Sequence, residues 1–111
     1  MLIPESLFRA LSDSTRLRCL LLLRAEGRLC VCELVHTLEL GQPRISRHLA
    51  QLRDMGIVEH ERHGQWVYYR LHPALPDWAL AALDAAARAD SLTPLSERLA
   101  AMPNRPLAYC D

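Results

Sequence analysis

The sequence of 111 residues contains no lysine, so all thirteen of its basic residues are arginines. Thirteen acidic residues balance them, and the net charge of zero gives no overall attraction to nucleic acid. Long apolar runs are also missing, because the richest stretch, residues 19–23, is far shorter than the roughly 20 residues that cross a bilayer. The chain also lacks a basic leader with a small-residue cleavage site. We therefore expect a cytoplasmic protein with no membrane partner.

The length fits one ordinary domain and leaves no room for a separate catalytic domain. Half of the residues are apolar and 23% are charged, so a chain of this size buries roughly two thirds of its unfolded surface and folds. A thiol reductase would need a Cys-x-x-Cys motif beside a βαβ unit, and the sequence has neither. We expect a protein that is not an enzyme.

Hydrophobic periodicity divides the first half of the chain into helices. Apolar residues recur at helical spacing near the N-terminus, and Asp13 opens a second, leucine-rich helix that Gly27 ends. Short helices follow at about 31–38 and 43–55, with a break at Gly41. Two short helices that meet across a tight turn predict a helix-turn-helix.

The pattern changes after this motif to the alternation that is typical of strands. We expect strands at about 58–62 and 65–71, joined around His63-Gly64, where a hairpin turn needs positive φ. A helix-turn-helix followed directly by a hairpin predicts a winged helix. The fold class is therefore mainly α with a β-hairpin, in the α+β class.

The segment 77–89 is rich in alanine and predicts a helix with a small-residue stripe: Trp78, Ala82 and Ala85. So small a monomer cannot fully cover this face or the first helix around Leu7 and Phe8, so we expect a homodimer. Prolines beyond residue 91 predict a short helix at about 96–102. We therefore expect residues 1–90 to form a DNA-binding and dimerisation domain, and residues 91–111 a partly flexible tail.

The basic residues are unevenly placed, and residues 42–53 contain three arginines and no acid. On a helix in this segment, five polar side chains lie away from the apolar face, where a recognition helix contacts the major groove: Gln42, Arg44, Ser46, Arg47 and His48. Three more at the tip of the hairpin are candidates for phosphate or minor-groove contacts: Arg62, His63 and Gln65. We expect these eight residues to bind double-stranded DNA.

The four cysteines are Cys19, Cys30, Cys32 and Cys110. A Cys-x-Cys pair is poorly placed for a disulfide between its own members, which favours binding of a metal or metalloid. Cys30 and Cys32 lie at a helix start, where the free N–H groups and the helix dipole lower the pKa of a thiol. Neighbours two apart on a regular helix point to different sides, so we expect a shared ligand to distort this helix start.

Three segments carry a family resemblance: 29–34 (LCVCEL), 42–49 (QPRISRHL) and 64–71 (GQWVYYRL). They resemble the ArsR/SmtB family of metal-responsive repressors, and its arsenic-sensing ArsR branch in particular, over roughly residues 5–88. The resemblance implies a homodimeric repressor that needs no cofactor and holds operator DNA when apo. It also implies release from the operator when cysteine thiolates bind As(III) or Sb(III) as the inducer.

As(III) is a soft ion that favours three thiolate ligands, and the sequence supplies two obvious ones, Cys30 and Cys32. In the ArsR branch the third commonly follows three residues later, where this chain has Val35. Cys110 is our candidate for the third ligand, from the same subunit or its partner, while Cys19 is the weaker choice because it lies among leucines. A site of two thiolates would instead suit a monosubstituted organoarsenical.

Other members of the family imply other inducers. A Cd(II)- or Pb(II)-responsive repressor is the runner-up, because related members build sulfur-rich sites around a similar cysteine pair. A thiol-based redox sensor is a further alternative. The zinc sites that some members form between C-terminal helices need histidine, and no histidine occurs after His72.

Overall fold

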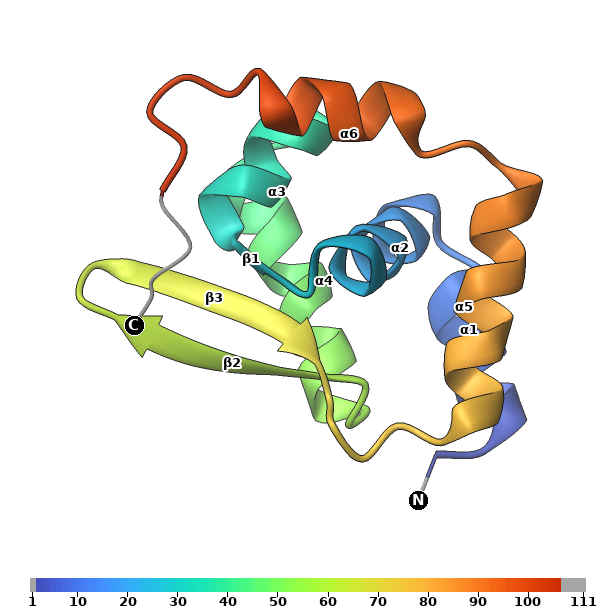
Figure 1. Ribbon diagram of the computed structural model, residues 1–111. Helices are drawn as coiled ribbons and strands as arrows, with labels where there is room; N and C mark the ends of the chain where they lie inside the picture. Colours follow the sequence, from blue (N-terminus) through green and yellow to red (C-terminus); the bar gives the residue numbers. More distant parts are fainter. Residues whose placement is uncertain (1, 107–111) are drawn as a thin grey trace.

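The computed structural model describes residues 2–106 (Figure 1). This part of the chain forms the following helices and strands, in order: α1 (Pro4–Leu11), α2 (Ser14–Glu26), β1 (Arg28–Cys30), α3 (Val31–Leu38), α4 (Gln42–Asp54), β2 (Val58–His63), β3 (Trp66–Leu71), α5 (Asp77–Ala89) and α6 (Thr93–Ala100). The expected winged helix is confirmed. No helix in the described residues is long and apolar enough to cross a membrane.

Helix α2 lies at the centre of the molecule and supplies much of its core. The carboxylate of Asp13 caps its first turn by accepting hydrogen bonds from the backbone N–H groups of Thr15, at 2.8 Å, and Arg16, at 3.1 Å. The helix ends at Gly27, whose φ of 89° suits glycine. Leucines on several sides of α2 are buried, because other elements surround it.

The helix-turn-helix consists of α3 and α4, close to the predicted bounds. Ile45, Leu49 and Leu52 are fully buried, as the helical spacing predicts. Between the helices the chain turns at Glu39, which has a left-handed φ of 57° and follows the last turn of α3. This short connection joins α3 directly to the recognition helix α4.

The sheet has one strand more than expected. Its order is β1-β3-β2 and all pairs are antiparallel, with Arg28 opposite Arg70 in the additional pair. His63 pairs with Trp66 at the end of the hairpin, so the two-residue turn is Gly64-Gln65, one position later than expected, and Gly64 has a φ of 60°. Strand β1 leads directly into α3, which fixes the start of that helix against the hairpin.

The last two helices pack on different sides of the core (Figure 1). Helix α5 contacts α2 through its buried face, which includes Ala79 and Leu83. Helix α6 begins three residues earlier than expected and packs against α3, with Leu99 buried. The segment beyond residue 91 therefore begins with a helix that contributes to the core.

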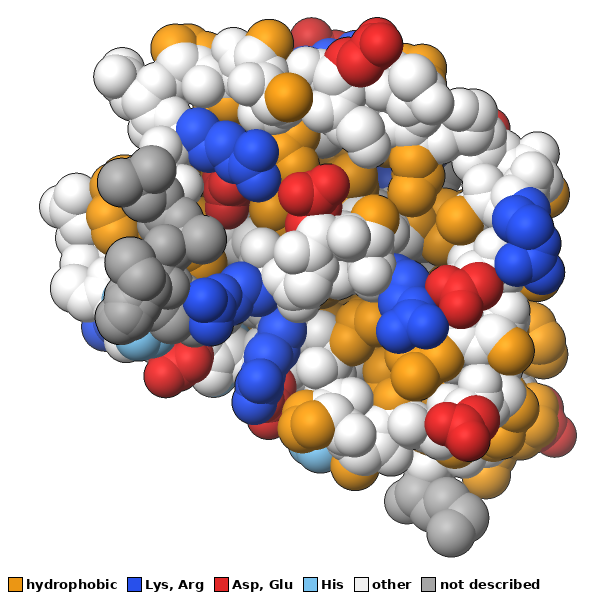
Figure 2. Space-filling view, in the orientation of Figure 1, with side chains coloured by type: hydrophobic (Ala, Val, Ile, Leu, Met, Phe, Trp, Pro, Cys, Tyr) orange, Lys and Arg blue, Asp and Glu red, His pale blue; other side chains and the backbone are white. Residues whose placement is uncertain are grey.

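Apolar side chains remain exposed on the side of α1 and α5. Figure 2 shows such side chains at the surface around the lower end of α5. Phe8 is 59% exposed, Ile3 49% and Trp78 39%. Leu2 and Trp78 line one groove, so the N-terminal segment and the start of α5 share this surface.

Candidate functional site

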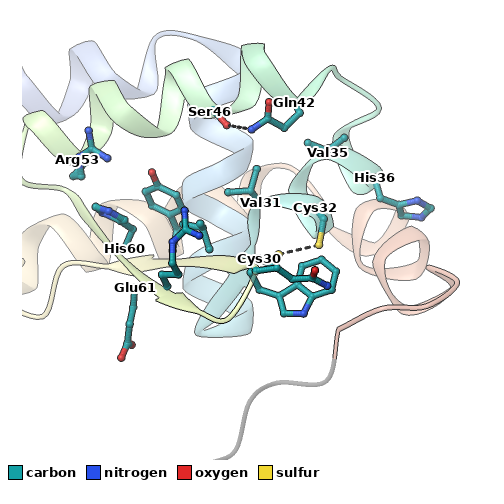
Figure 3. Close-up of a pocket in the computed structure, with 15 residues that line it drawn as sticks. Cys30, Val31, Cys32, Val35, His36, Gln42, Ser46, Arg53, His60 and Glu61 are labelled. Carbon is teal, nitrogen blue, oxygen red and sulfur yellow. Dashed lines mark hydrogen bonds between the residues drawn. The ribbon is translucent and has the colours of Figure 1, made fainter.

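The two cysteines of the Cys-x-Cys motif lie together at the start of α3. Cys30 ends β1 and is the N-cap residue of α3, with an extended backbone, while Cys32 lies in the first turn. Their Sγ atoms are 2.8 Å apart (Figure 3). The expectation that this helix start must be distorted to bring the sulfurs together is wrong, because Cys30 precedes the regular helix.

Glu33 holds the backbone at this point. Its side chain is buried, and its Oε1 accepts a hydrogen bond from the backbone N–H of Cys30 at 2.7 Å. This is a capping box in which Cys30 takes the place of the usual serine or threonine. The other carboxylate oxygen, Oε2, pairs with Nε of Arg105 at 2.5 Å. The chain after α6 is thereby tied to the thiol site, a contact that the sequence does not reveal.

The thiol of Cys32 is protonated at neutral pH. Burial raises its pKa to about 12, and the neighbouring Cys30 and the carboxylate of Glu33 act in the same direction. The lowered pKa expected at a helix start is therefore wrong for Cys32. A ligand must displace or take up this proton when it binds the sulfur.

A groove of about 840 Å³ opens between α3, α4 and the hairpin, and both cysteines line it. Its apolar walls include Val31, Val35 and Trp66. Gln42 and Ser46, two of the expected DNA-binding residues, also line it, and Figure 3 shows them across the groove from the sulfurs. A molecule bound at the thiols therefore occupies a space that the recognition helix shares.

The described residues supply no third ligand. No group of three histidine, cysteine or acidic side chains in residues 2–106 is arranged to hold a metal ion. Cys19 is fully buried in the core, and burial raises the pKa of its thiol to about 12. Val35, the residue at the position where the resemblance implies a third cysteine, lines the groove with an apolar side chain. Cys110 lies outside the described residues.

The first half of α4 presents part of the expected DNA-binding set. Gln42, Arg44 and Arg47 are exposed on it, opposite the buried Ile45 and Leu49. Ser46 is half-buried and accepts a hydrogen bond from Nε2 of Gln42 at 2.7 Å. These side chains can donate to phosphates or to base edges in a major groove.

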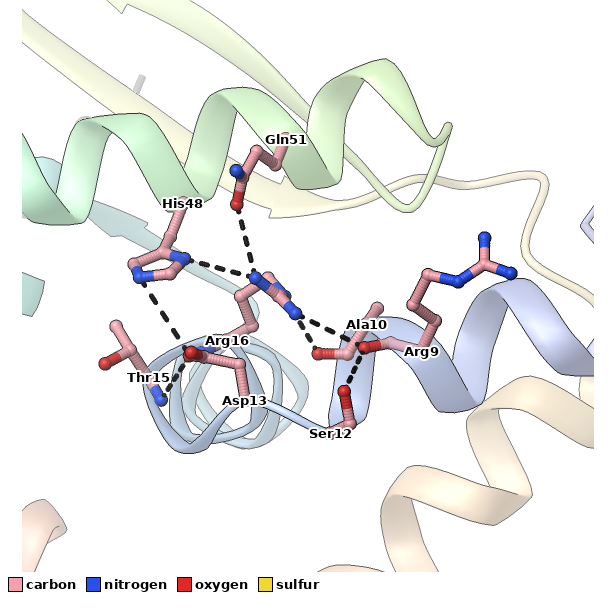
Figure 4. Close-up of polar contacts among 8 residues, drawn as sticks. All are labelled: Arg9, Ala10, Ser12, Asp13, Thr15, Arg16, His48 and Gln51. Atoms are coloured by element: carbon pink, nitrogen blue, oxygen red, sulfur yellow. Dashed lines mark hydrogen bonds and ion pairs between the residues drawn. The ribbon is translucent and has the colours of Figure 1, made fainter.

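His48 differs from the exposed residues of α4, because its side chain is mostly buried. Its side chain is 12% exposed, and Nε2 lies 3.9 Å from Oδ1 of Asp13. Figure 4 shows the ring turned toward Arg16 of α2, which also donates to Oε1 of Gln51 and to the carbonyl of Ala10. This cluster connects the recognition helix to the junction of α1 and α2.

The hairpin places Arg62 and Gln65 at the surface near its tip. His63 is half-buried instead, with Nε2 3.2 Å from Oε2 of Glu61 and its ring edge against Tyr68. Of the three expected wing residues, Arg62 and Gln65 are therefore the most available to a nucleic acid.

A further basic side chain lies beside the recognition helix. Arg18 and Ser14 of α2 are exposed and line the same groove as Arg44. The sequence gives no periodic signal for this proximity, because it depends on how α2 crosses α4. The basic surface therefore extends from α4 onto α2.

Comparison with known proteins places this architecture in a family. Residues 13–60 match the family described as bacterial regulatory protein, arsR family. The chain is 55% identical to the arsenic resistance transcriptional regulator ArsR1 of Pseudomonas putida over 108 residues, which cover 96% of this chain and 84% of that protein. The chain belongs to the ArsR family. It is thus a DNA-binding transcriptional regulator and not an enzyme.

Solved structures agree with this ArsR-family assignment. Reduced HlyU from Vibrio cholerae is similar with a TM-score of 0.70 and 32% identity, covering 78% of this chain and 87% of that one. The antimony-specific transcriptional repressor AntR is similar with a TM-score of 0.65 and 30% identity, covering 75% of this chain and 72% of that one. The winged helix of this ArsR-family protein is therefore shared with regulators whose structures are known.

Proposed function

We propose that this ArsR-family protein is an arsenic resistance repressor. As a homodimer it binds operator DNA when apo and leaves it when cysteine thiolates bind As(III) or Sb(III). The observation that carries the proposal is the pair of sulfurs, 2.8 Å apart, at the start of the helix that precedes the recognition helix. Similarity to ArsR1, an arsenic resistance regulator, and to AntR, an antimony-specific repressor, supports a trivalent arsenic or antimony compound as the inducer.

The binding chemistry requires no oxidant. Arsenite at neutral pH is As(OH)₃, and each thiol that forms an As–S bond gives its proton to a departing hydroxide, which leaves as water. Cys30 and Cys32 form two such bonds in our proposal, and Cys110 forms the third. Because thiol protons leave within water, the protonated thiol of Cys32 is a competent ligand for arsenite.

Release of DNA follows from the position of the groove. The bound metalloid lies between α3 and the hairpin, and Gln42 and Ser46 of the recognition helix line the same space. Formation of the As–S bonds around one arsenic atom shifts the start of α3, and α4 follows through the short connection at Glu39. Linkage then requires operator DNA to weaken arsenite binding by the same factor, typically about 1–3 kcal/mol.

The decisive experiment is a titration of the purified protein on a dyad-symmetric fragment of its own promoter. Arsenite, antimonite, methylarsenite, cadmium and zinc are compared by fluorescence anisotropy of the DNA. We expect arsenite and antimonite to release the wild type, and the variant Cys30→Ser/Cys32→Ser to bind the fragment normally and resist release. Release of that double variant at the wild-type arsenite concentration would overturn the proposal.

An organoarsenical inducer is the second candidate, and the groove beside the thiols favours it. Two thiols suffice for a monosubstituted arsenical, and the apolar walls formed by Val31, Val35 and Trp66 can contact its carbon substituent. Methylarsenite acting at lower concentration than arsenite would support it. The raised pKa of Cys32 argues against the redox-sensing alternative, because peroxide oxidises thiolates selectively.

A further inference from the structure

One side chain of α2 contacts two other helices in the cluster that Figure 4 shows. Nε of Arg16 donates to the carbonyl of Ala10 at 3.1 Å, and Nη2 donates to the carbonyl of Arg9 at 3.3 Å. Nη1 donates to Oε1 of Gln51 at 3.3 Å and lies 3.5 Å from Nδ1 of His48. The guanidinium of Arg16 therefore joins α1, α2 and α4.

The contacts to α1 hold the end of a short helix. A helix leaves its last carbonyl groups without partners inside the helix, and the helix dipole favours a cation near that end. Arg9 and Ala10 lie in the last turn of α1, where Arg16 supplies both donors and a positive charge. Two hydrogen bonds from one rigid, planar group thus fix α1 relative to Arg16.

The contacts to α4 orient this helix about its own axis. Its buried face, with Ile45, Leu49 and Leu52, packs through apolar contacts, which have no preferred direction, whereas hydrogen bonds do. His48 and Gln51 are three residues apart and lie on neighbouring turns of one face. Contacts on two successive turns restrict the rotation of α4 relative to α2.

The exposed residues of α4 move with any such rotation. Arg44 and Arg47 are exposed in the first half of the helix. A recognition helix contacts base edges only when its side chains enter the major groove at the correct angle, and neighbouring hydrogen bonds supply this precision. The orientation that Arg16 gives to α4 therefore governs how these side chains meet the DNA.

The other end of this connection lies on the helix that we expect at the dimer interface. Phe8 is 59% exposed on α1 and precedes Arg9, whose carbonyl accepts from Arg16. In a homodimer that forms on α1, the path from one recognition helix to the other runs through Arg16 of each subunit. A dyad operator presents its half-sites about 34–36 Å apart, or at multiples of this distance. The contacts of Arg16 thus bear on the spacing that the dimer accepts.

We propose that Arg16 is a positioning residue for operator recognition: by joining the last turn of α1 to two turns of α4, it sets the half-site spacing that the homodimer accepts. This inference rests on the proposed function, and specifically on a homodimer that binds a dyad operator. It assigns Arg16 no contact with DNA. Its effect is on the choice between operators of different spacing.

The test compares three DNA fragments that differ only at the centre of the dyad: the native promoter sequence, one with a base pair inserted and one with a base pair removed. Each change moves a half-site by about 3.4 Å and rotates it by about 34–36°. Anisotropy titrations of the full-length protein, at fixed salt and without metalloid, give the three dissociation constants. We expect the wild type to prefer the native spacing by at least about tenfold, and Arg16→Ala by less than about threefold.

A second pair of variants changes only the contact to α4. Gln51 is exposed, so Gln51→Ala spares the core and leaves the hydrogen bonds of Arg16 to α1 in place. It should lower the preference for native spacing as Arg16→Ala does, and Gln51→Glu, which keeps an acceptor for Nη1, should restore it. The preference is a ratio of affinities, so an added charge that weakens binding to all three fragments cancels. If Arg16→Ala does not fold, the two variants of Gln51 decide the question.

Arg18→Ala is the matched control. Arg18 is an exposed arginine of the same helix, and it lines a groove together with Arg44. We expect this variant to keep the wild-type preference, whatever its overall affinity. Urea unfolding measures the stability of every variant. Lower stability of Arg16→Ala and Gln51→Ala with an unchanged preference would show that Arg16 only supports the fold, and the inference would be wrong.

The outcomes also distinguish this inference from the proposed function. If the wild type does not bind the native fragment or sediments as a monomer, the proposed function is wrong and this inference falls with it. If the wild type prefers the native spacing and Arg16→Ala and Gln51→Ala do so equally, the proposed function stands and the role of Arg16 is refuted. Equal binding of all three fragments by the wild type refutes that role as well, because no spacing is then selected.

Discussion

At the scale of single residues, α4 divides into side chains that face outward and one that is turned inward. Arg47 is exposed in the first half of the helix, whereas His48 faces Asp13 and Arg16. Neighbours in the sequence thus have different surroundings, because successive residues on a helix differ by about 100° in direction. Of the two, only Arg47 has the exposed side chain that the proposed DNA contact requires.

The first prediction compares these neighbours. Arg47→Ala should weaken operator binding by about 1–3 kcal/mol at fixed salt, because it removes a contact to a phosphate or a base, and leave the response to arsenite intact. His48→Ala should lower stability more than it lowers operator affinity, because it disturbs the cluster with Arg16. Anisotropy titrations and urea unfolding of both variants measure the two effects. Equal operator affinity of Arg47→Ala and wild type would refute the role of Arg47.

The raised pKa of Cys32 leads to a prediction that separates metalloid from metal ion. At neutral pH the thiol of Cys32 is protonated, because its pKa is about 12. Cd(II) must expel that proton, so its affinity should rise at least about tenfold per unit rise in pH near neutrality. Arsenite carries hydroxides that take up the proton as water, so its affinity should change little between about pH 6 and pH 8. Calorimetry in buffers of different ionisation enthalpy measures the number of protons released when Cd(II) or arsenite binds. Proton release on arsenite binding would contradict the chemistry proposed for the site.

At the scale of the elements, the start of α2 depends on one capping side chain. Hydrogen bonds from the backbone N–H groups of Arg16 and Thr15 lower the pKa of Asp13 below its ordinary value of 3.8, and the one from Arg16 contributes most to this lowering. Asp13→Ala should therefore cost about 1 kcal/mol of unfolding free energy at neutral pH. Because the folded-state pKa is lowered, this contribution is present above about pH 4 and is lost as the pH falls through the lowered value.

Urea unfolding at several pH values measures the effect of the cap. The exposed Asp90 at the end of α5 provides a matched control, and Asp90→Ala should unfold near the wild-type midpoint at every pH. If the difference in unfolding free energy between Asp13→Ala and wild type stays constant down to pH 2, the charge of the Asp13 carboxylate does not cause that difference.

Local patterns predicted the helices well, and contacts distant in sequence explain what they missed. The bounds of α4 differ by about one residue from the expectation, because its apolar spacing and Gly41 mark it directly. Strand β1 has only three residues and pairs with β3, about forty residues later, so no local period reveals it.

The same distinction applies to the site. The Cys-x-Cys motif marked the thiols, but their proximity depends on Cys30 lying before the helix, and the pKa of Cys32 depends on burial by distant segments. The inward turn of His48 and the ion pair of Arg105 with Glu33 likewise result from tertiary packing. Sequence periodicity cannot indicate such contacts, because it reports one element at a time.

At the scale of the whole molecule, the exposed apolar side chains offer a surface on which the proposed homodimer would form. Phe8 on α1 and Trp78 on α5 are large and exposed, and Ala81 and Ala85 continue an exposed small-residue face along α5. Small side chains allow a partner helix to approach closely, and the aromatic rings supply apolar area. Burial of this surface against a second copy would also place two recognition helices about a dyad, as a symmetric operator requires.

The last prediction tests this arrangement with a substitution on α1. Phe8→Glu places a charge on each side of the dyad, so both copies lose apolar area and gain like charges across the interface. We expect the wild type to sediment as a dimer at micromolar concentration and Phe8→Glu as a folded monomer. Trp66→Ser removes another exposed aromatic ring, on the hairpin, and should remain dimeric. The monomeric variant should bind arsenite normally and bind a dyad operator far more weakly, because one winged helix contacts only one half-site. A wild-type protein that sediments as a monomer, or a Phe8→Glu variant that stays dimeric, would refute an interface built on α1.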